Sequence, residues 1–221
     1  IEVSAYGIYQ DGKLLTVVET KGTADSLVNE TLAYYKKPAK GMRMDQIKFA
    51  KQVEVKQIDV MLTSVQSKKQ ASEQLVNGGV ISMSHIIKSG ENVNSVAKKY
   101  DVNIKDMSGK NSEQAVSNLK SGDLVKMEKT VTPLEIRTVE SGKMSEPIPY
   151  ETEKQETKDL YKGESLVAQE GVEGRQIVSG TITKVNGKEV KEEYDHILEV
   201  CHITKVNHQE TCHNIQEEES N

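Results

Sequence analysis

Hydrophobic and polar positions alternate in three stretches of the first 84 residues, as expected for half-buried strands. Residues 4–10 and 13–19 alternate on either side of Asp11-Gly12. This dipeptide favours a two-residue hairpin turn, because both central positions need a positive φ. Alternation returns over residues 52–61 and predicts a third strand. Its inward side chains are expected to be Val53, Val55 and either Ile58 or Val60.

Two segments of the same region have a helical pattern instead. Thr23 or Asp25 is a suitable N-cap for a helix that runs to about Lys37, where a proline follows. Residues 68–76 predict a short second helix that ends before a glycine pair. The region contains no His, no Cys and no close carboxylate pair among apolar residues. We therefore expect a small α+β domain without an active site over residues 1–84.

The next segment, residues 85–129, predicts the order strand, helix, helix, strand. Residues 85–88 form the first strand, and Asn92 is a good cap for the first helix. Asn103 or Ile104 is expected to open a second short helix near Met107, and the last strand covers residues 124–127. The buried face of the first helix is predicted to consist of Val93, Val96, Ala97 and Tyr100.

This segment resembles the LysM domain, a module that binds peptidoglycan and chitin. The resemblance is carried by HIIKSGENV at 85–93, VAKKYDV at 96–102, Asn111 and LKSGDLVKM at 119–127. The sequence departs from the family pattern at Glu91-Asn92, which replaces Asp-Thr, and at Asp101, which replaces Gly. The resemblance implies a βααβ fold.

The resemblance also implies a site for glycans that contain N-acetylglucosamine, between the loop at 89–93 and the loop at 107–119. In such a site, backbone groups face the acetamido groups and apolar side chains contact the sugar faces. The predicted glycan-binding residues are Gly90, Glu91, Asn92, Val93, Met107, Asn111 and Leu119. The alternative is that Asn92 only caps the helix and Asn111 only satisfies a turn.

The last part of the chain is acidic and predicts strands. Residues 130–221 carry 10 basic and 19 acidic side chains, whereas the whole chain has a net charge of −5. Asn186-Gly187 marks a second tight hairpin, and Pro147 and Pro149 suit an edge or extended strand. Because residues 130–206 have too few apolar positions for a sandwich core, we expect a thin, elongated sheet exposed on both faces.

This part resembles the G5 (five-glycine) domain of bacterial surface proteins. The matching stretches are EPIPYET at 146–152, LYKGE at 160–164, VAQEG at 167–171 and VNGKEV at 185–190. The glycines that the resemblance assigns to the name are Gly163, Gly171, Gly174, Gly180 and Gly187. Each is expected where a strand bends or where the backbone needs a positive φ.

The combined order implies a multidomain α+β protein with an N-terminal domain, a LysM module over 85–129, an elongated all-β G5 domain over 130–206 and a tail over 207–221. It resembles the front half of lysostaphin-like endopeptidases of Gram-positive cell walls, whose catalytic domain would follow Asn221. The implied function is to bind peptidoglycan and to target a secreted hydrolase to the wall. The alternative is a structural or adhesive surface segment in which the G5 domain is a spacer or self-association module.

The expected location is extracellular and associated with the cell wall, without membrane insertion, nucleic-acid binding or a cofactor. The net negative charge and the lack of a long apolar run agree with this expectation. A lysostaphin-like zinc site needs an H-x-x-x-D pair and an H-x-H pair, and the five histidines provide neither. We therefore predict that the chain has no catalytic residues and no catalytic metal.

The two cysteines leave three interpretations open. Cys201-His202, His208 and Cys212-His213 could provide four ligands for structural zinc, although their spacing matches no familiar finger. A disulfide between Cys201 and Cys212 would suit a secreted protein. The third interpretation is a tail in which the Cys and His residues are incidental.

Overall fold

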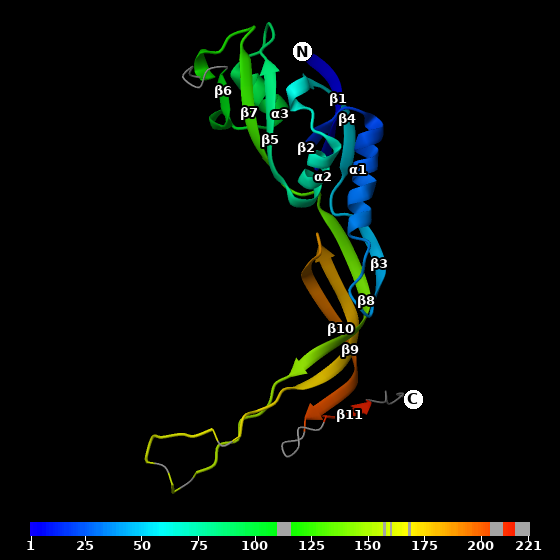
Figure 1. The fold of residues 1–221 in the computed structure, drawn as a ribbon, viewed down its shortest axis with the longest axis vertical. Coiled ribbons are helices and arrows are strands. Elements are labelled where there is room, and N and C mark those ends of the chain that lie inside the picture. Colours follow the sequence, from blue (N-terminus) through cyan, green and yellow to red (C-terminus); the bar gives the residue numbers. More distant parts are fainter. Residues whose placement is uncertain (110–115, 157, 160, 168, 204–209, 215–221) are drawn as a thin grey trace. The chain divides into compact units, whose positions relative to one another are not determined.

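The chain folds into two compact units that together are strand-rich and mixed α/β (Figure 1). The computed structural model describes residues 1–109, 116–156, 158–159, 161–167, 169–203 and 210–214. The first unit comprises Ile1–Lys37, Gln46–Thr138 and Lys184–Lys188. The second comprises Pro38–Asp45, Val139–Thr183 and Glu189–Asn221. None of the helices in the described part of the chain is long and apolar enough to cross a membrane.

A three-stranded antiparallel sheet opens the first unit. Strands β1 (Glu2–Gln10), β2 (Lys13–Val18) and β4 (Val53–Met61) lie in the order β2-β1-β4. The predicted hairpin is confirmed, since Asp11 and Gly12 have φ values of 53° and 75° between β1 and β2. The third strand is also confirmed, and Val60 is its fully buried residue while Ile58 is half-buried.

Two helices cover one face of this sheet. Helix α1 (Lys21–Tyr34) begins earlier than expected, because Thr20 accepts a hydrogen bond from the backbone N–H of Thr23. Helix α2 (Lys68–Asn77) confirms the predicted second helix, and Ser67 begins it with a capping box. The helices and the sheet share a core of Ile8, Leu15, Val18, Ala24, Leu27, Ala71, Leu75, Leu134 and Ile136.

A second antiparallel sheet follows in the same unit. Strands β5 (Gly79–Ile86), β6 (Met107–Gly109) and β7 (Leu124–Val131) lie in the order β5-β7-β6. Helix α3 (Val93–Tyr100) lies between β5 and β6 in the chain, and its predicted buried face of Val93, Val96, Ala97 and Tyr100 is confirmed. The helix ends at Asp101, which has the left-handed φ of 53° at the position where the LysM pattern has Gly.

The second short helix predicted to begin at Asn103 or Ile104 is confirmed as a single 3₁₀ turn, Ile104–Asp106, with Asn103 as its N-cap. This turn ends before Met107, which lies in β6. Met107 pairs with Met127 of β7 and is buried. Pairing with β7 satisfies the backbone groups of this short segment and buries the methionine, so an additional edge strand, which the sequence prediction missed, follows the turn.

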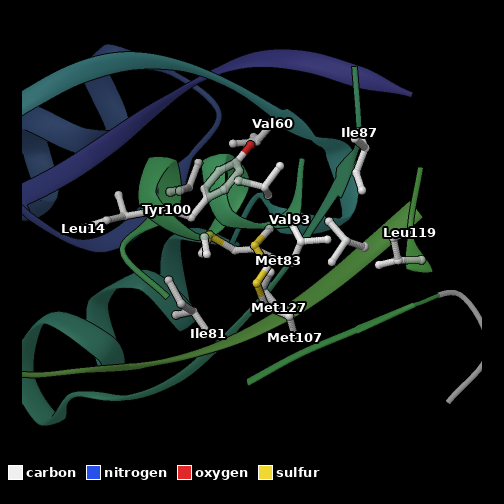
Figure 2. Packing of buried hydrophobic residues seen from close by; sticks show 14 of the residues in the cluster. Leu14, Val60, Ile81, Met83, Ile87, Val93, Tyr100, Met107, Leu119 and Met127 are labelled. Atoms are coloured by element: carbon white, nitrogen blue, oxygen red, sulfur yellow. The ribbon is translucent and has the colours of Figure 1, made fainter. Parts of the chain in front are cut away.

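The two sheets of the first unit share one hydrophobic core. Figure 2 shows Tyr100 of α3 among side chains from both sheets, with Leu14 and Val60 from the first and Met83 and Met127 from the second. In addition, β5 begins at Gly79, before the end of the predicted N-terminal domain. Residues 1–84 and 85–129 thus pack together in one unit. The division of the sequence into an N-terminal domain, a LysM module and a G5 domain with the bounds given above stays a prediction.

The third sheet contains β3 (Met42–Phe49), β8 (Ile136–Ile148), β9 (Gly174–Val185), β10 (Lys188–Ile203) and β11 (Glu210–Asn214). Their order is β11-β10-β9-β8-β3, so the sequence prediction missed β3. Most of this sheet forms the second unit, whose described residues include no helix.

The described part of this sheet is thin, as the sequence predicts. All side chains of residues 187–197 are exposed, although successive residues of a strand point to opposite faces. Solvent therefore covers both faces of β10 over residues 188–197. The predicted hairpin between β9 and β10 is confirmed, with φ values of 49° at Asn186 and 76° at Gly187.

Candidate functional site

The first predicted glycan-binding loop lies between β5 and α3 and is exposed around Gly90. Gly90 has a φ of 83°, and a Cβ atom built on it would meet nothing within 4 Å. The backbone N–H of Glu91 donates to the carbonyl of Lys88, which closes a tight turn. The backbone of Gly90 is therefore open to a ligand.

Glu91 anchors this loop from within. One of its carboxylate oxygens lies 2.7 Å from Nε2 of His85 and accepts a hydrogen bond of 2.9 Å from the backbone N–H of Lys88. These two hydrogen bonds hold the pKa of the Glu91 carboxyl below its ordinary value. Both hydrogen bonds engage the same oxygen, Oε2, and through it Glu91 positions the loop.

His85 links Glu91 to the buried residue Tyr100 through its second ring nitrogen. Its Nδ1 atom lies 3.1 Å from the hydroxyl of Tyr100, and both side chains are buried. Burial raises the pKa of the Tyr100 phenol, so this group stays neutral. The sequence prediction missed this hydrogen-bonded series, which runs from Glu91 through His85 to Tyr100, although all three residues belong to the LysM-like motifs. The sequence signal that could have revealed these hydrogen bonds is a single His before a helix with an inward-facing Tyr.

Asn92 caps α3, as the alternative interpretation holds. Its side-chain oxygen accepts a hydrogen bond of 3.0 Å from the backbone N–H of Ser95. The Ser95 hydroxyl in turn accepts one of 2.9 Å from the backbone N–H of Asn92. This capping box uses the carbonyl oxygen of the Asn92 side chain and leaves its amide N–H groups available for a ligand.

The apolar members of the predicted site lie in the shared core. Val93, Met107 and Leu119 are only 8%, 5% and 8% exposed and belong to one hydrophobic cluster (Figure 2). They therefore position the two loops and offer little surface to a sugar face. Asn111 lies outside the described residues. The assignment of all seven residues to glycan binding stays a prediction.

A hollow of about 380 Å³ lies on the second sheet beside Met107. Strands β5, β6 and β7 provide most of its walls, including Met83, Ser108 and Met127. Lys105, Lys126, Asp106 and Glu128 add charges of both signs at this hollow. Of the predicted glycan residues in the described part of the chain, Met107 alone contributes to it.

The cysteines form a disulfide between β10 and β11. Cys201 and Cys212 are directly opposite each other in the strand register, with their Cα atoms 4.0 Å apart. The bond occupies both sulfur atoms, so the four-ligand zinc hypothesis fails in this structure. His208 lies outside the described residues. Of the three interpretations that the sequence left open, the disulfide is therefore the one that the structure shows.

The glycines assigned by resemblance occupy special positions in the second unit and at the hairpin. Gly163 and Gly187 have positive φ values. At Gly180, a Cβ atom would collide with the backbone carbonyl of Glu193, and at Gly174 it would lie 2.6 Å from that of Cys201. These two positions lack the space for any side chain, since neighbouring backbone passes close by.

The strand-rich region that contains these glycines is an exposed β-sheet domain without helices in its described residues. A model of the G5 domain matches residues 139–195, which cover most of β8, all of β9 and the first half of β10. The chain thus carries a G5 domain, which is a non-catalytic type of domain. No curated protein and no solved structure matches the chain.

Proposed function

We propose that the chain is a non-catalytic region that binds peptidoglycan and targets a secreted hydrolase of the Gram-positive cell wall. The observation that carries the proposal is the G5 domain at 139–195, which is consistent with a segment associated with the cell wall or with adhesion. The resemblance of residues 85–129 to LysM adds the ligand class, a glycan with N-acetylglucosamine.

The local structure of this LysM-like segment supports the proposal in two respects. Asn92 caps α3 at the position of the motif, and the helix buries the predicted apolar face. Asp101 takes the left-handed conformation where the family pattern has Gly. The cap at Asn92 and the conformation of Asp101 agree with the sequence motif. Gly90 leaves room for a ligand at the neighbouring turn.

A titration with chitin oligomers tests the proposed site. We expect the backbone amides of residues 89–93 to shift in NMR spectra of the whole chain, while those of the G5 domain stay unchanged. A shallow single site should bind weakly, with a dissociation constant of about 1 mM. Shifts confined to residues 139–195 would instead identify the G5 domain as the part that binds the wall.

Two substitutions separate direct contact from helix capping. Asn92→Ser keeps a capping oxygen but removes the amide N–H groups, whereas Asn92→Ala removes both. If the Asn92 amide contacts the sugar, both variants should bind chitin oligomers more weakly than the unmodified chain. If Asn92→Ser binds normally, this side chain acts only as a cap.

The exposed sheet supports a second candidate function, an adhesive or structural segment. Both faces of β10 are open to solvent over residues 188–197, and the exposed apolar side chains there include Val190, Tyr194 and Ile197. A self-association module should show a mass that rises with concentration in sedimentation equilibrium. A constant monomer mass together with binding to purified cell walls would favour the first function.

A further inference from the structure

Strand β5 has one open edge. It pairs with β7 from Gly79 opposite Val131 to Ile86 opposite Leu124, and no other described strand forms a ladder with it. In an antiparallel pair, alternate residues turn their backbone N–H and C=O groups toward the partner, and the others turn them outward. The N–H of Ser84 donates to Oγ of Ser64, at 3.0 Å, so the even-numbered residues face outward.

Val80 and Ser82 therefore direct their backbone groups toward the open edge. Ser84 has a partner in Ser64, whereas no hydrogen bond to these outward groups of Val80 and Ser82 comes from any residue that the structure describes. Both residues are also exposed, with Val80 at 57%. Unpaired edge groups of this kind are a template for one more strand.

A cleft of about 600 Å³ lies at this part of the edge and is lined by Val80 and Ser82. Its other wall is provided by α2 and the segment before it. Five of the wall side chains are carboxamides or a carboxylate, namely Gln66, Gln70, Gln74, Asn77 and Glu73. The cleft is therefore lined mainly by groups that donate and accept hydrogen bonds.

Part of this hydrogen-bonding capacity is unused. Gln70 belongs to the capping box of α2, and Gln74 accepts a hydrogen bond from the hydroxyl of Thr16. Asn77 and Glu73, by contrast, form no side-chain hydrogen bond or ion pair with any residue in the described part of the chain. Glu73 is the charged residue of the lining, and no Lys or Arg accompanies it. The cleft should therefore repel anions and accept neutral or cationic groups.

We propose that this cleft binds an extended polypeptide segment, which carries Lys or Arg and no acidic side chain, as an additional strand on β5. An extended peptide presents its outward N–H and C=O groups every second residue, about 6.8 Å apart. Val80 and Ser82 present theirs with the same repeat. This proposal goes beyond the glycan site, because it uses none of the seven residues assigned there.

Synthetic peptides test the proposal on the whole chain. The probe is a blocked hexapeptide, TVTKVT, which is compared with a peptide that has Glu in place of Lys and with one N-methylated at every internal amide. We expect TVTKVT to shift the amide signals of Val80 and Ser82 in NMR spectra. The N-methylated peptide should bind at least about tenfold more weakly, because it cannot donate backbone hydrogen bonds.

Three variants make the test specific. Ser82→Pro removes one outward N–H and leaves the ladder to β7 intact, as an edge strand allows, and should weaken TVTKVT about tenfold. Val80→Thr changes only the side chain and should bind as before. Glu73→Gln should lose the preference for the Lys peptide over the Glu peptide. If Ser82→Pro does not fold, the N-methylated peptide and the Glu73→Gln variant still test whether the peptide binds as a strand on β5.

Several results would overturn the proposal. One is equal binding of the N-methylated peptide, and another is a set of peptide shifts that avoids the cleft. A third is a chitin tetramer that shifts Val80 and Ser82 while TVTKVT does not, which would make the cleft a second glycan site. The failure of the LysM-like loops to bind chitin would leave this test unaffected.

Discussion

Lys129 is a charged residue that the fold buries. Its side chain is 8% exposed, and Nζ lies 3.0 Å from the carbonyls of Tyr100 and Asp101 and from a carboxylate oxygen of Asp101. A cation at this position stabilises the C-terminal end of α3, where the last carbonyls have no partner within the helix.

Lys129→Met should therefore lower the free energy of unfolding of the first unit by about 1–3 kcal/mol. The methionine fills similar space but leaves the carbonyls of Tyr100 and Asp101 without a donor. Lys126→Met, at an exposed position of the same strand, is the matched control and should change stability by less than about 0.5 kcal/mol. Urea unfolding measures both, and equal effects of the two substitutions would contradict the assigned role.

Glu91 makes stability depend on pH. Its folded-state pKa lies below the ordinary value of 4.5, because His85 and the backbone of Lys88 donate to the carboxylate. Such a group stabilises the fold above its unfolded pKa, and this contribution is lost as the pH falls through the folded pKa. Glu91→Gln should therefore be less stable than the unmodified chain at pH 6 and lose less stability between pH 5 and pH 3. Parallel acid titrations followed by circular dichroism would show whether the two curves converge.

At the scale of single elements, local sequence signals account for most of what could be predicted. Asp11-Gly12 and Asn186-Gly187 define both hairpins, since the turn conformation depends on the dipeptide itself. Helix α3 follows from its cap and its apolar face. Strand β3 was missed because its neighbour β8 lies some 90 residues later in the chain. Pairing between distant segments leaves no mark in a local pattern.

At the predicted glycan site, too, the local features could be predicted from the sequence and the contacts between distant segments could not. Motif matching located the turn at Gly90 and the cap at Asn92, which depend on neighbours in sequence. It did not foresee that Met107 and Leu119 would be buried in a core shared with the first sheet. Burial of this kind depends on how two sheets pack, and the alternation of hydrophobic residues alone does not specify the partner sheet.

The G5 sheet should be sensitive to a side chain at Gly180. In Gly180→Ala, the new methyl group would collide with the carbonyl of Glu193 on the neighbouring strand, so β9 and β10 would have to separate locally. We expect faster hydrogen exchange of the β9 and β10 amides and a loss of more than about 1 kcal/mol. Ser179→Ala, one residue earlier on β9, is the control and should leave exchange nearly unchanged.

At the scale of the whole chain, the proposed function is binding without catalysis. The described residues bring together one potential metal-ligand group, Glu199 with Cys201 and Cys212, and the disulfide occupies both of its sulfur atoms. We expect the purified chain to leave the turbidity of isolated cell walls constant, with or without added zinc. Clearing of the walls that depends on a metal would contradict the assignment of a non-catalytic region.

The disulfide also determines how the chain responds to mechanical tension. Cys201 and Cys212 are separated by 11 positions in the sequence, while their Cα atoms are 4.0 Å apart. A pulling force that passes beyond Cys212 is transmitted through the sulfur bridge, so the intervening residues carry no load. Reduction should add about 35 Å of contour length, because a fully extended chain spans about 3.3–3.6 Å per residue. In force spectroscopy this appears as a longer final extension with reductant, and a Cys201→Ser, Cys212→Ser chain should show that longer extension in either condition.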